Sequence, residues 1–278
     1  MKVPMTVDRS RLPVPGMTPP FAFPSIERST LSSGLRVWTV RHVSIPVATV
    51  MLLVRRGAAD DPPGREGLAA ITTDMLDEGT GTLSSIDVHE SLARIGAQLD
   101  SDIGPDATLL TVTVLSRFLQ PAISMLADMV VRPAMREEDF TRVRQQRLHR
   151  LMQLRDMPGA VADRAIMRLL YGAHPYGHTP LGSEASLSAL SVDDARAFHA
   201  GQLRPADATL VVAGDCDHAE VTNLVDAAFT GWNGATTCYC SIDPKEKLIA
   251  MIWAQHTPNA EFQLYEHFNA LVYAALFH

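Results

Sequence analysis

The chain has 278 residues, of which 46% are hydrophobic and 20% are charged, and its formal net charge is -7. This composition is typical of a globular protein and excludes a disordered chain. The negative charge, with no stripe of Lys and Arg, excludes a surface that follows nucleic-acid phosphates. No stretch approaches the ~20 apolar residues of a membrane span, and no apolar signal-peptide core is present near the N-terminus. We therefore expect a soluble protein of the cytoplasm.

The first half of the chain alternates between strand and helix patterns. Residues 1–23 are rich in proline and are expected to form an extended arm. Residues 35–43 and 47–55 are rich in β-branched side chains and flank a short Ser-Ile-Pro segment, which predicts two strands paired with each other. Apolar residues at helical spacing then predict a helix from Gly67 that ends before Gly79. The same patterns predict a second helix and two more strands, over residues 86–95, 97–101 and 107–115.

The second half is mainly helical. Ser116 is expected to cap one helix, and a long helix over 136–156 follows, whose basic face we interpret as solvated. A capping box at Ser191 to Asp194 predicts the start of another helix. Helices over 160–171 and 219–229 and a buried strand over 208–214 complete the pattern. Strands and helices that do not strictly alternate predict an α+β layer fold, with helices packed on one face of a sheet.

Several strings occur in the order typical of one peptidase family. They are GLRVWTV at 34–40, GLAAITTDMLDEGT at 67–80, HPYG at 174–177 followed by Leu181-Gly182, and VVAGD at 211–215. Together they resemble the N-terminal domain of the pitrilysin/insulinase-type zinc metallopeptidases, the group that includes the mitochondrial processing peptidases. The resemblance covers residues 24–233. It implies the LuxS/mitochondrial-processing-peptidase-like layer fold, with a mixed, mostly antiparallel sheet.

The resemblance also implies that a zinc site has been lost. Active members carry H-x-x-E-H on the helix that corresponds to 67–80, where two His one turn apart bind zinc and the Glu activates water. In this chain Ala70 and Asp74 stand at the His positions and Thr73 at the Glu position, and the distal ligand position falls near Arg150. We therefore expect neither a catalytic residue nor a bound cofactor, although active relatives hold zinc.

Other residues offer poor replacements for that site. An ion pair between Asp74 and Arg150 would bridge two helices where zinc binds in active relatives, but two separately solvated charges are an equal alternative. His174 and His178 are four residues apart, yet Pro175 lies between them and prevents a helix, which favours a structural loop. The cysteines, Cys216, Cys238 and Cys240, have neither a disulfide framework's spacing nor that of a zinc site.

The last residues fit the family pattern less well. Residues 236–240 have no partner in the pattern, whereas a strand is predicted over 248–254 and an amphipathic helix over 262–277. Residues 234–278 resemble the C-terminal strand and helix of β-lactamase-like serine hydrolases, although no S-x-x-K motif is present. Three hypotheses follow. The first is a non-catalytic homologue that pairs with an active zinc peptidase of the same family and takes peptides along the sheet edge near 96–115. The second is a truncated or chimeric product without activity, and the third is a residual zinc-dependent peptidase or serine hydrolase.

Overall fold

The computed structural model describes residues 16–17, 22–232, 237–243 and 248–254, with side chains only in the first two ranges. Most of the expected arm, and the helix that the pattern predicts over 262–277, lie outside the described residues. Within the described ranges, no helix has the length and apolarity to cross a membrane.

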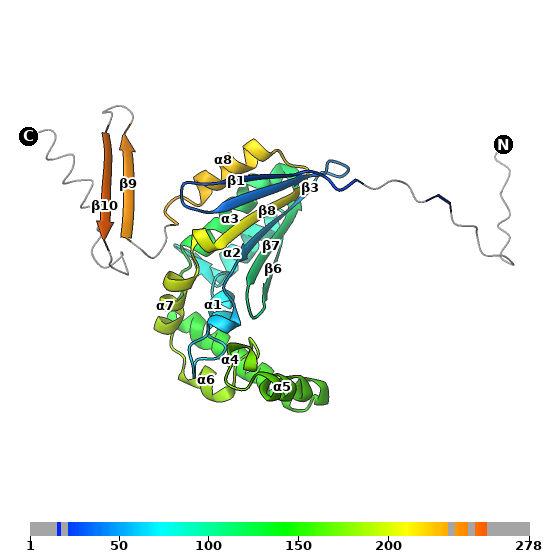
Figure 1. Cartoon of the computed structure of the whole chain (residues 1–278), viewed down its shortest axis with the longest axis vertical. Helices are drawn as coiled ribbons and strands as arrows, with labels where there is room; N and C mark the ends of the chain where they lie inside the picture. Colours follow the sequence, from blue (N-terminus) through cyan, green and yellow to red (C-terminus); the bar gives the residue numbers. More distant parts are fainter. Residues whose placement is uncertain (1–15, 18–21, 233–236, 244–247, 255–278) are drawn as a thin grey trace, which may run out of the picture.

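Ten strands and eight α-helices are described (Figure 1). The strands are β1 (Ile26–Thr30), β2 (Arg36–Arg41), β3 (Val47–Val54), β4 (Gly79–Thr80), β5 (Leu83–Ser84), β6 (Gln98–Ile103), β7 (Thr108–Leu115), β8 (Ala208–Gly214), β9 (Thr237–Asp243) and β10 (Leu248–Ala254). The helices are α1 (Leu68–Asp74), α2 (Ser85–Arg94), α3 (Leu119–Val131), α4 (Glu137–Arg155), α5 (Pro158–Tyr171), α6 (Glu184–Ala189), α7 (Val192–Gln202) and α8 (His218–Ala228). Short 3-10 turns are η1 (Ala58–Asp60), η2 (Ser116–Phe118), η3 (Pro175–Gly177) and η4 (Pro205–Asp207).

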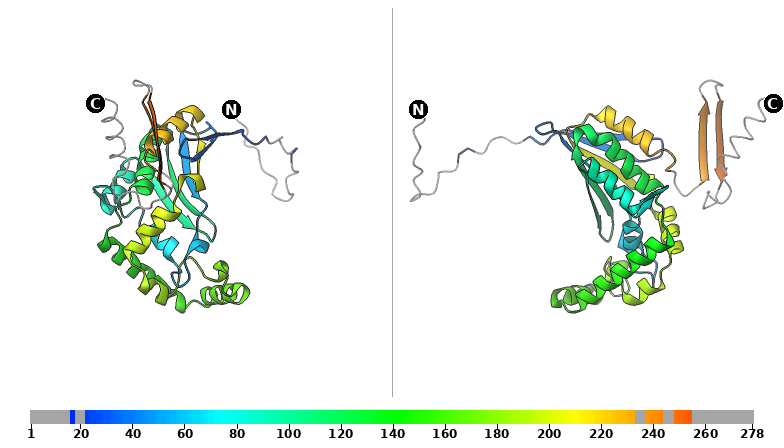
Figure 2. Two further views of the ribbon diagram at one scale, coloured as in Figure 1. Left: turned by 60° about the vertical axis from the view of Figure 1, so that its left-hand side comes forward. Right: turned by 180° about the vertical axis from the view of Figure 1, so that it is seen from behind.

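Six strands form one mixed sheet in the order β1-β2-β8-β3-β7-β6. Only the β2–β8 pair is parallel, and all the other neighbours are antiparallel. Helices α3 and α8 lie side by side against one face of this sheet (Figure 2). The predicted α+β layer fold with a mostly antiparallel sheet is therefore confirmed.

The predicted pairing between the strands near 35–43 and 47–55 is wrong, because β8 lies between them. Val212 of β8 is in register with Val50 of β3 and, on its other edge, with Thr39 of β2. The sequence ATLVVAG is apolar on both faces, and such a strand is stable at the centre of a sheet. Gly214 permits this insertion, because a Cβ there would lie 2.2 Å from the carbonyl oxygen of Val47.

The core lies between the sheet and its helices. Alternate residues of β3 are fully buried on the helix side, whereas the others are half-buried on the opposite face. This period of two is the expected signature of a sheet that is covered on one side. Burial of each large apolar side chain contributes roughly 1.5–3 kcal/mol to folding. The largest fully buried side chains are Phe140, Leu35, Leu52, Ile71, Met75, Leu76, Ile123, Leu126, Met129, Leu187, Leu190 and Leu210.

The helix boundaries confirm one predicted cap and overturn another. Ser191 and Asp194 form the predicted capping box, in which the Ser191 amide donates to the Asp194 carboxylate at 2.8 Å. Ser116, by contrast, does not cap α3, because η2 intervenes and the helix begins at Leu119. The Ser116 hydroxyl has no hydrogen-bond partner among the described residues.

Several elements escaped the sequence analysis. They include β1, which pairs with β2 at the edge of the sheet, the short antiparallel pair of β4 and β5, and α6, which begins at a capping box between Ser183 and Ser186. The predicted strand over 248–254 is confirmed as β10, and it forms an antiparallel hairpin with β9. The sequence had offered no partner for the segment that forms β9.

Candidate functional site

The helix that corresponds to the family's metal motif is α1, and Asp61 fixes its first turn. Gly67 precedes the helix with φ of 96°, a left-handed conformation that favours glycine. The Asp61 carboxylate accepts hydrogen bonds from the amides of Gly67 and Ala69, both at 2.7 Å. Burial raises the pKa of this carboxyl to about 6, and the two hydrogen bonds oppose that rise. The helix therefore starts at a well-defined position.

Two of the motif positions on α1 carry side chains that pack inside the protein. Ala70 is 1% exposed and has no side-chain atom that could bind a metal ion. Thr73, at the position predicted for the family's catalytic Glu, is 5% exposed. Its hydroxyl donates to the carbonyl oxygen of Ala69 at 2.9 Å, within the same helix. Neither side chain is placed to activate water.

The third motif position, Asp74, is held by Arg147 of α4. The Nε atom of Arg147 lies 2.6 Å from Oδ2 of Asp74, and the arginine side chain is only 13% exposed. The ion pair thus bridges the two helices, but through a different arginine from the one that the sequence analysis considered.

Arg150 does not meet Asp74, so the first of the two open alternatives, an ion pair between these residues, does not form. Arg150 is exposed, and its one described hydrogen bond is a long one of 3.5 Å to Gln153. Helical phase explains the difference. Arg147 lies four residues after Val143 and four before Leu151, both buried, so it shares their face of α4. Arg150 is rotated away from that face.

The remaining arginines of α4 also make specific contacts. Arg142 pairs with Glu78, which follows α1, and with Asp139 at 3.1 Å. Arg144 donates to the carbonyl oxygen of Leu190 at 2.8 Å. The interpretation of this face as merely solvated is therefore wrong for three of its four arginines. They fix α4 against α1 and the segment before α7.

The motif helix lies beside the free edge of the sheet. Among the residues that the structure describes, strand β6 is the last strand in the order and pairs only with β7. A small cavity of about 10 Å³ separates α1 from this strand, and Thr73 and Asp77 line it together with Leu99 and Ser101 of β6. Asp77 is partly buried and lies 3.7 Å from His89, and burial raises the pKa of its carboxyl. The motif positions and the edge strand therefore form one site.

The residues at this site do not fit a zinc ion. A catalytic zinc needs three protein ligands, whereas the motif positions offer one carboxylate, already paired with a buried guanidinium. Among the described residues, no three His, Cys, Asp or Glu side chains gather as a ligand set. His174 accepts a hydrogen bond from the amide of Tyr176 at 3.1 Å and stacks edge-on with its ring, which favours the structural interpretation of the HPYG loop.

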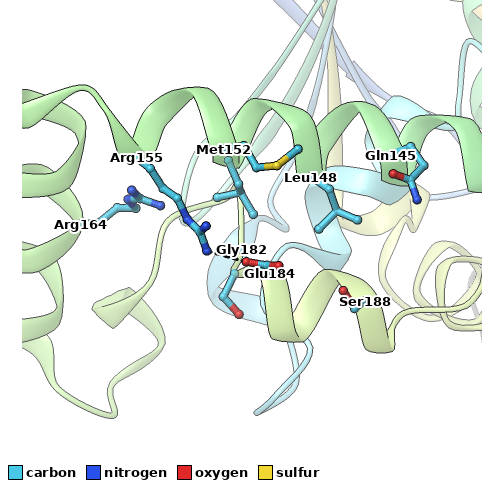
Figure 3. Close-up of a pocket in the computed structure, with 10 residues that line it drawn as sticks. Gln145, Leu148, Met152, Arg155, Arg164, Gly182, Glu184 and Ser188 are labelled. Atoms are coloured by element: carbon cyan, nitrogen blue, oxygen red, sulfur yellow. Dashed lines mark hydrogen bonds and ion pairs between the residues drawn. The ribbon is translucent and has the colours of Figure 1, made fainter.

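A larger cavity of about 360 Å³ lies between α4 and α6 (Figure 3). Leu148 and Met152 of α4 line it, and an ion pair of 2.6 Å between Arg155 and Glu184 crosses it. Neither Arg147 nor a residue of α1 is among the residues that line this cavity. The cavity is therefore separate from the metal-motif helix, and the candidate site remains the α1–β6 junction.

Two family patterns match the chain. The family described as Insulinase (Peptidase family M16) matches residues 36–184, and Peptidase M16 inactive domain matches residues 189–274. The chain belongs to the M16 peptidase family. The resemblance to pitrilysin/insulinase-type peptidases is thus confirmed. The second match extends over most of the 234–278 tail, whose resemblance to serine hydrolases stays a prediction.

The similar curated proteins are called uncharacterized zinc proteases. One from Streptomyces coelicolor is 27% identical over 74% of this chain and 45% of its own length. One from Mycobacterium tuberculosis is 28% identical over 73% of this chain and 46% of its own length. This chain therefore spans about half the length of the curated relatives it matches.

Solved structures with the same fold include a peptidase M16 inactive domain from Pseudomonas fluorescens. Its TM-score is 0.70 at 22% identity, over 74% of this chain and 50% of that one. A protease from Helicobacter pylori has a TM-score of 0.72 at 22% identity, over 76% of this chain and 51% of that one. Pitrilysin has a TM-score of 0.68 at 20% identity, over 76% of this chain and 23% of its own.

Proposed function

We propose that this M16 chain is a non-catalytic subunit that pairs with an active zinc peptidase of the same family. The Asp74–Arg147 ion pair carries the proposal. It places a largely buried cation against the only carboxylate among the motif positions of α1. A dication would have to displace that guanidinium and would still lack two ligands. We therefore propose that this chain binds no zinc at the position where active relatives hold it.

The pairing is supported by the size of the relatives. This chain covers 24% of the periplasmic protease PqqL from Escherichia coli and 46% of the first half of that protein. Larger members of this fold thus contain several stretches of the length matched here. A stretch of this kind without ligands for zinc is suited to lie beside another stretch that carries H-x-x-E-H.

The contribution that we propose for this subunit is to hold peptides at the edge of the sheet. Within the described part of the chain, the backbone of the edge strand β6 is unpaired on one side, and extended peptides add to such edges through main-chain hydrogen bonds. Residues Gln98, Asp100, Ser101 and Asp102 of this strand are all exposed. Thr73 lines the gap between α1 and β6. A peptide added to the edge of β6 would therefore lie near the motif positions.

The division of the chain remains part of the proposal. Residues 1–23 are assigned to an arm, 24–233 to the peptidase-like domain and 234–278 to a separate tail. Limited proteolysis with mass spectrometry tests these boundaries, since cleavage is expected to concentrate near residues 23 and 234. Stable fragments that end well inside 24–233 would contradict the assignment.

Affinity purification from the source cell tests the partner role, with intact-mass analysis of the complex. We expect the chain to be recovered in fixed stoichiometry with an M16 subunit that carries H-x-x-E-H. The isolated chain is expected to hold no stoichiometric zinc by metal analysis and to cleave no peptide. Recovery of the chain alone, or peptide cleavage by the isolated chain that a zinc chelator stops, would overturn the proposal.

A further inference from the structure

Two aspartates on the edge strand bear charges that no described residue neutralises. Asp100 and Asp102 of β6 are exposed, and neither forms a hydrogen bond or an ion pair within the part of the chain that the structure describes. Neighbouring carboxylates are already engaged. Asp106, in the turn after β6, accepts a hydrogen bond from the Tyr176 hydroxyl at 2.6 Å, and Asp77 lies near His89.

The strand geometry places both aspartates on one face of the sheet. Residues two apart on a strand point to the same side, so Asp100 and Asp102 share the face opposite to α1. In the antiparallel pairing of β6 with β7, Asp100 is opposite Thr111 and Asp102 is opposite Leu109. These β7 neighbours bring no cation to the aspartates. The free edge of β6 therefore carries two negative charges, on residues that are two apart along the strand.

We propose that the β6 edge selects extended peptides with basic residues at alternate positions. A peptide added beside β6 brings its side chains within about 5 Å of the β6 side chains on the same face. Residues i and i+2 of that peptide would then face Asp100 and Asp102. Lys or Arg at both positions would neutralise the two carboxylates, whereas Asp or Glu would be repelled. This inference rests on the proposed role of β6 as a peptide-binding edge and specifies its substrate class.

Fluorescence anisotropy with labelled eight-residue peptides tests the proposal on the full chain at low ionic strength. An alternating Lys-Thr peptide is expected to bind between about two- and thirtyfold more tightly than its Glu-Thr counterpart, as two cross-strand charge pairs would predict. The preference should weaken with salt, because exposed charges are screened. A peptide with the same composition but four consecutive Lys should bind less tightly than the alternating one.

Two variants make the test specific. Asp100→Asn combined with Asp102→Asn is expected to abolish the preference for Lys over Glu. Asp226→Asn, at an exposed position on α8, should leave it unchanged. Equal binding of the Lys and Glu peptides, no binding of either, or an equal effect of the Asp226 variant would overturn the proposed selectivity.

A backbone control separates this inference from the proposed function on which it rests. The alternating Lys peptide with N-methylated amides at alternate positions cannot donate the hydrogen bonds of strand addition. We expect it to bind at least tenfold more weakly than the parent peptide. If methylation weakens binding while Lys and Glu peptides bind alike, the edge binds peptides but the charge selectivity is wrong. If methylation has no effect, strand addition at β6 is itself wrong, whatever the pull-down of a partner shows.

Discussion

The Nε atom of Arg147 lies 2.6 Å from Oδ2 of Asp74, so the residue that the sequence analysis places at a zinc-ligand position is held by a side-chain cation. The pair joins α1 to α4. Arg147 lies about one helical turn before Arg150, the residue at which the family's spacing places the distal ligand. We therefore expect the role of this ion pair to be structural.

Loss of Arg147 should therefore destabilise the fold. Arg147→Met keeps most of the apolar stem but leaves the partly buried Asp74 carboxylate without its partner, which we expect to cost about 1–3 kcal/mol. Arg150→Met, at the exposed neighbouring arginine, should change the free energy of unfolding by less than about 0.5 kcal/mol. Urea denaturation measures both. Equal effects would show that the ion pair contributes nothing specific.

The Leu181-Gly182 string has a steric explanation that yields a second prediction. Gly182 has φ of +77°, and a Cβ there would lie 2.2 Å from the carbonyl oxygen of Glu66, just before the start of α1. Gly182→Ala is therefore expected to lower the free energy of unfolding by about 2–4 kcal/mol. Gly201→Ala in α7, where nothing lies within 4 Å, should instead stabilise by about 0.5–1 kcal/mol. Thermal unfolding of both variants checks this, and a neutral Gly182→Ala would contradict the steric argument.

Local patterns predicted most of the elements, because the evidence for them lies within each segment. The strand over 208–214 was visible from its apolar run, yet its neighbours were not, since β8 pairs with strands more than 150 residues earlier in the chain. Sequence proximity favoured a β2–β3 hairpin instead. Long-range strand order depends on which edges remain free, and a single segment does not carry that information.

The candidate site shows the same division between local and long-range information. The family's spacing predicts the motif positions at Ala70, Thr73 and Asp74. Counting residues to the distal position, however, pointed to Arg150. The apolar positions Val143 and Leu151 would have identified Arg147, since residues four apart share a helix face. The cap from Asp61 was missed because it acts across a loop of several residues.

The pKa of Asp61 predicts an unusual dependence of stability on pH. Its value of about 6 in the folded protein lies above the ordinary 3.8, because the carboxyl is buried. Between pH 3.8 and 6 the folded state binds the proton and the unfolded state does not, so this group makes the fold less stable as the pH rises through that window. Asp61→Asn should remove that slope in urea titrations from pH 4 to 7.

Asp87 provides a control of opposite sign for the Asp61 prediction. It is an exposed capping residue of α2, and hydrogen bonds from Ser84 lower the pKa of its carboxyl. The Asp87 carboxylate therefore stabilises the fold at pH values above the pKa that it has in the unfolded chain. This stabilisation is lost as the pH falls through the lower pKa that it has in the folded protein. Asp87→Asn should weaken the acid-induced loss of stability. The same change of slope in both variants would contradict the assignment to Asp61.

His199 opposes Asp61 at mildly acidic pH. Its Nε2 lies 2.7 Å from the carbonyl oxygen of Val130 and so must donate a proton to it, and burial lowers the pKa of the ring below 6.5. As the pH falls below 6.5, the unfolded state gains a proton that the folded state does not, so stability is lost until the folded pKa is reached. His199→Gln keeps an N–H donor for Val130 but cannot titrate.

The two effects can be separated in the Asp61→Asn background. There, His199→Gln is expected to flatten the fall in the free energy of unfolding below pH 6.5, whereas the exposed control His149→Gln should leave that fall in place. If both histidine variants give the same curve, the contact between α7 and the end of α3 is not the source of the acid sensitivity. A flattened curve for His199→Gln alone would assign that sensitivity to a single imidazole between α7 and α3.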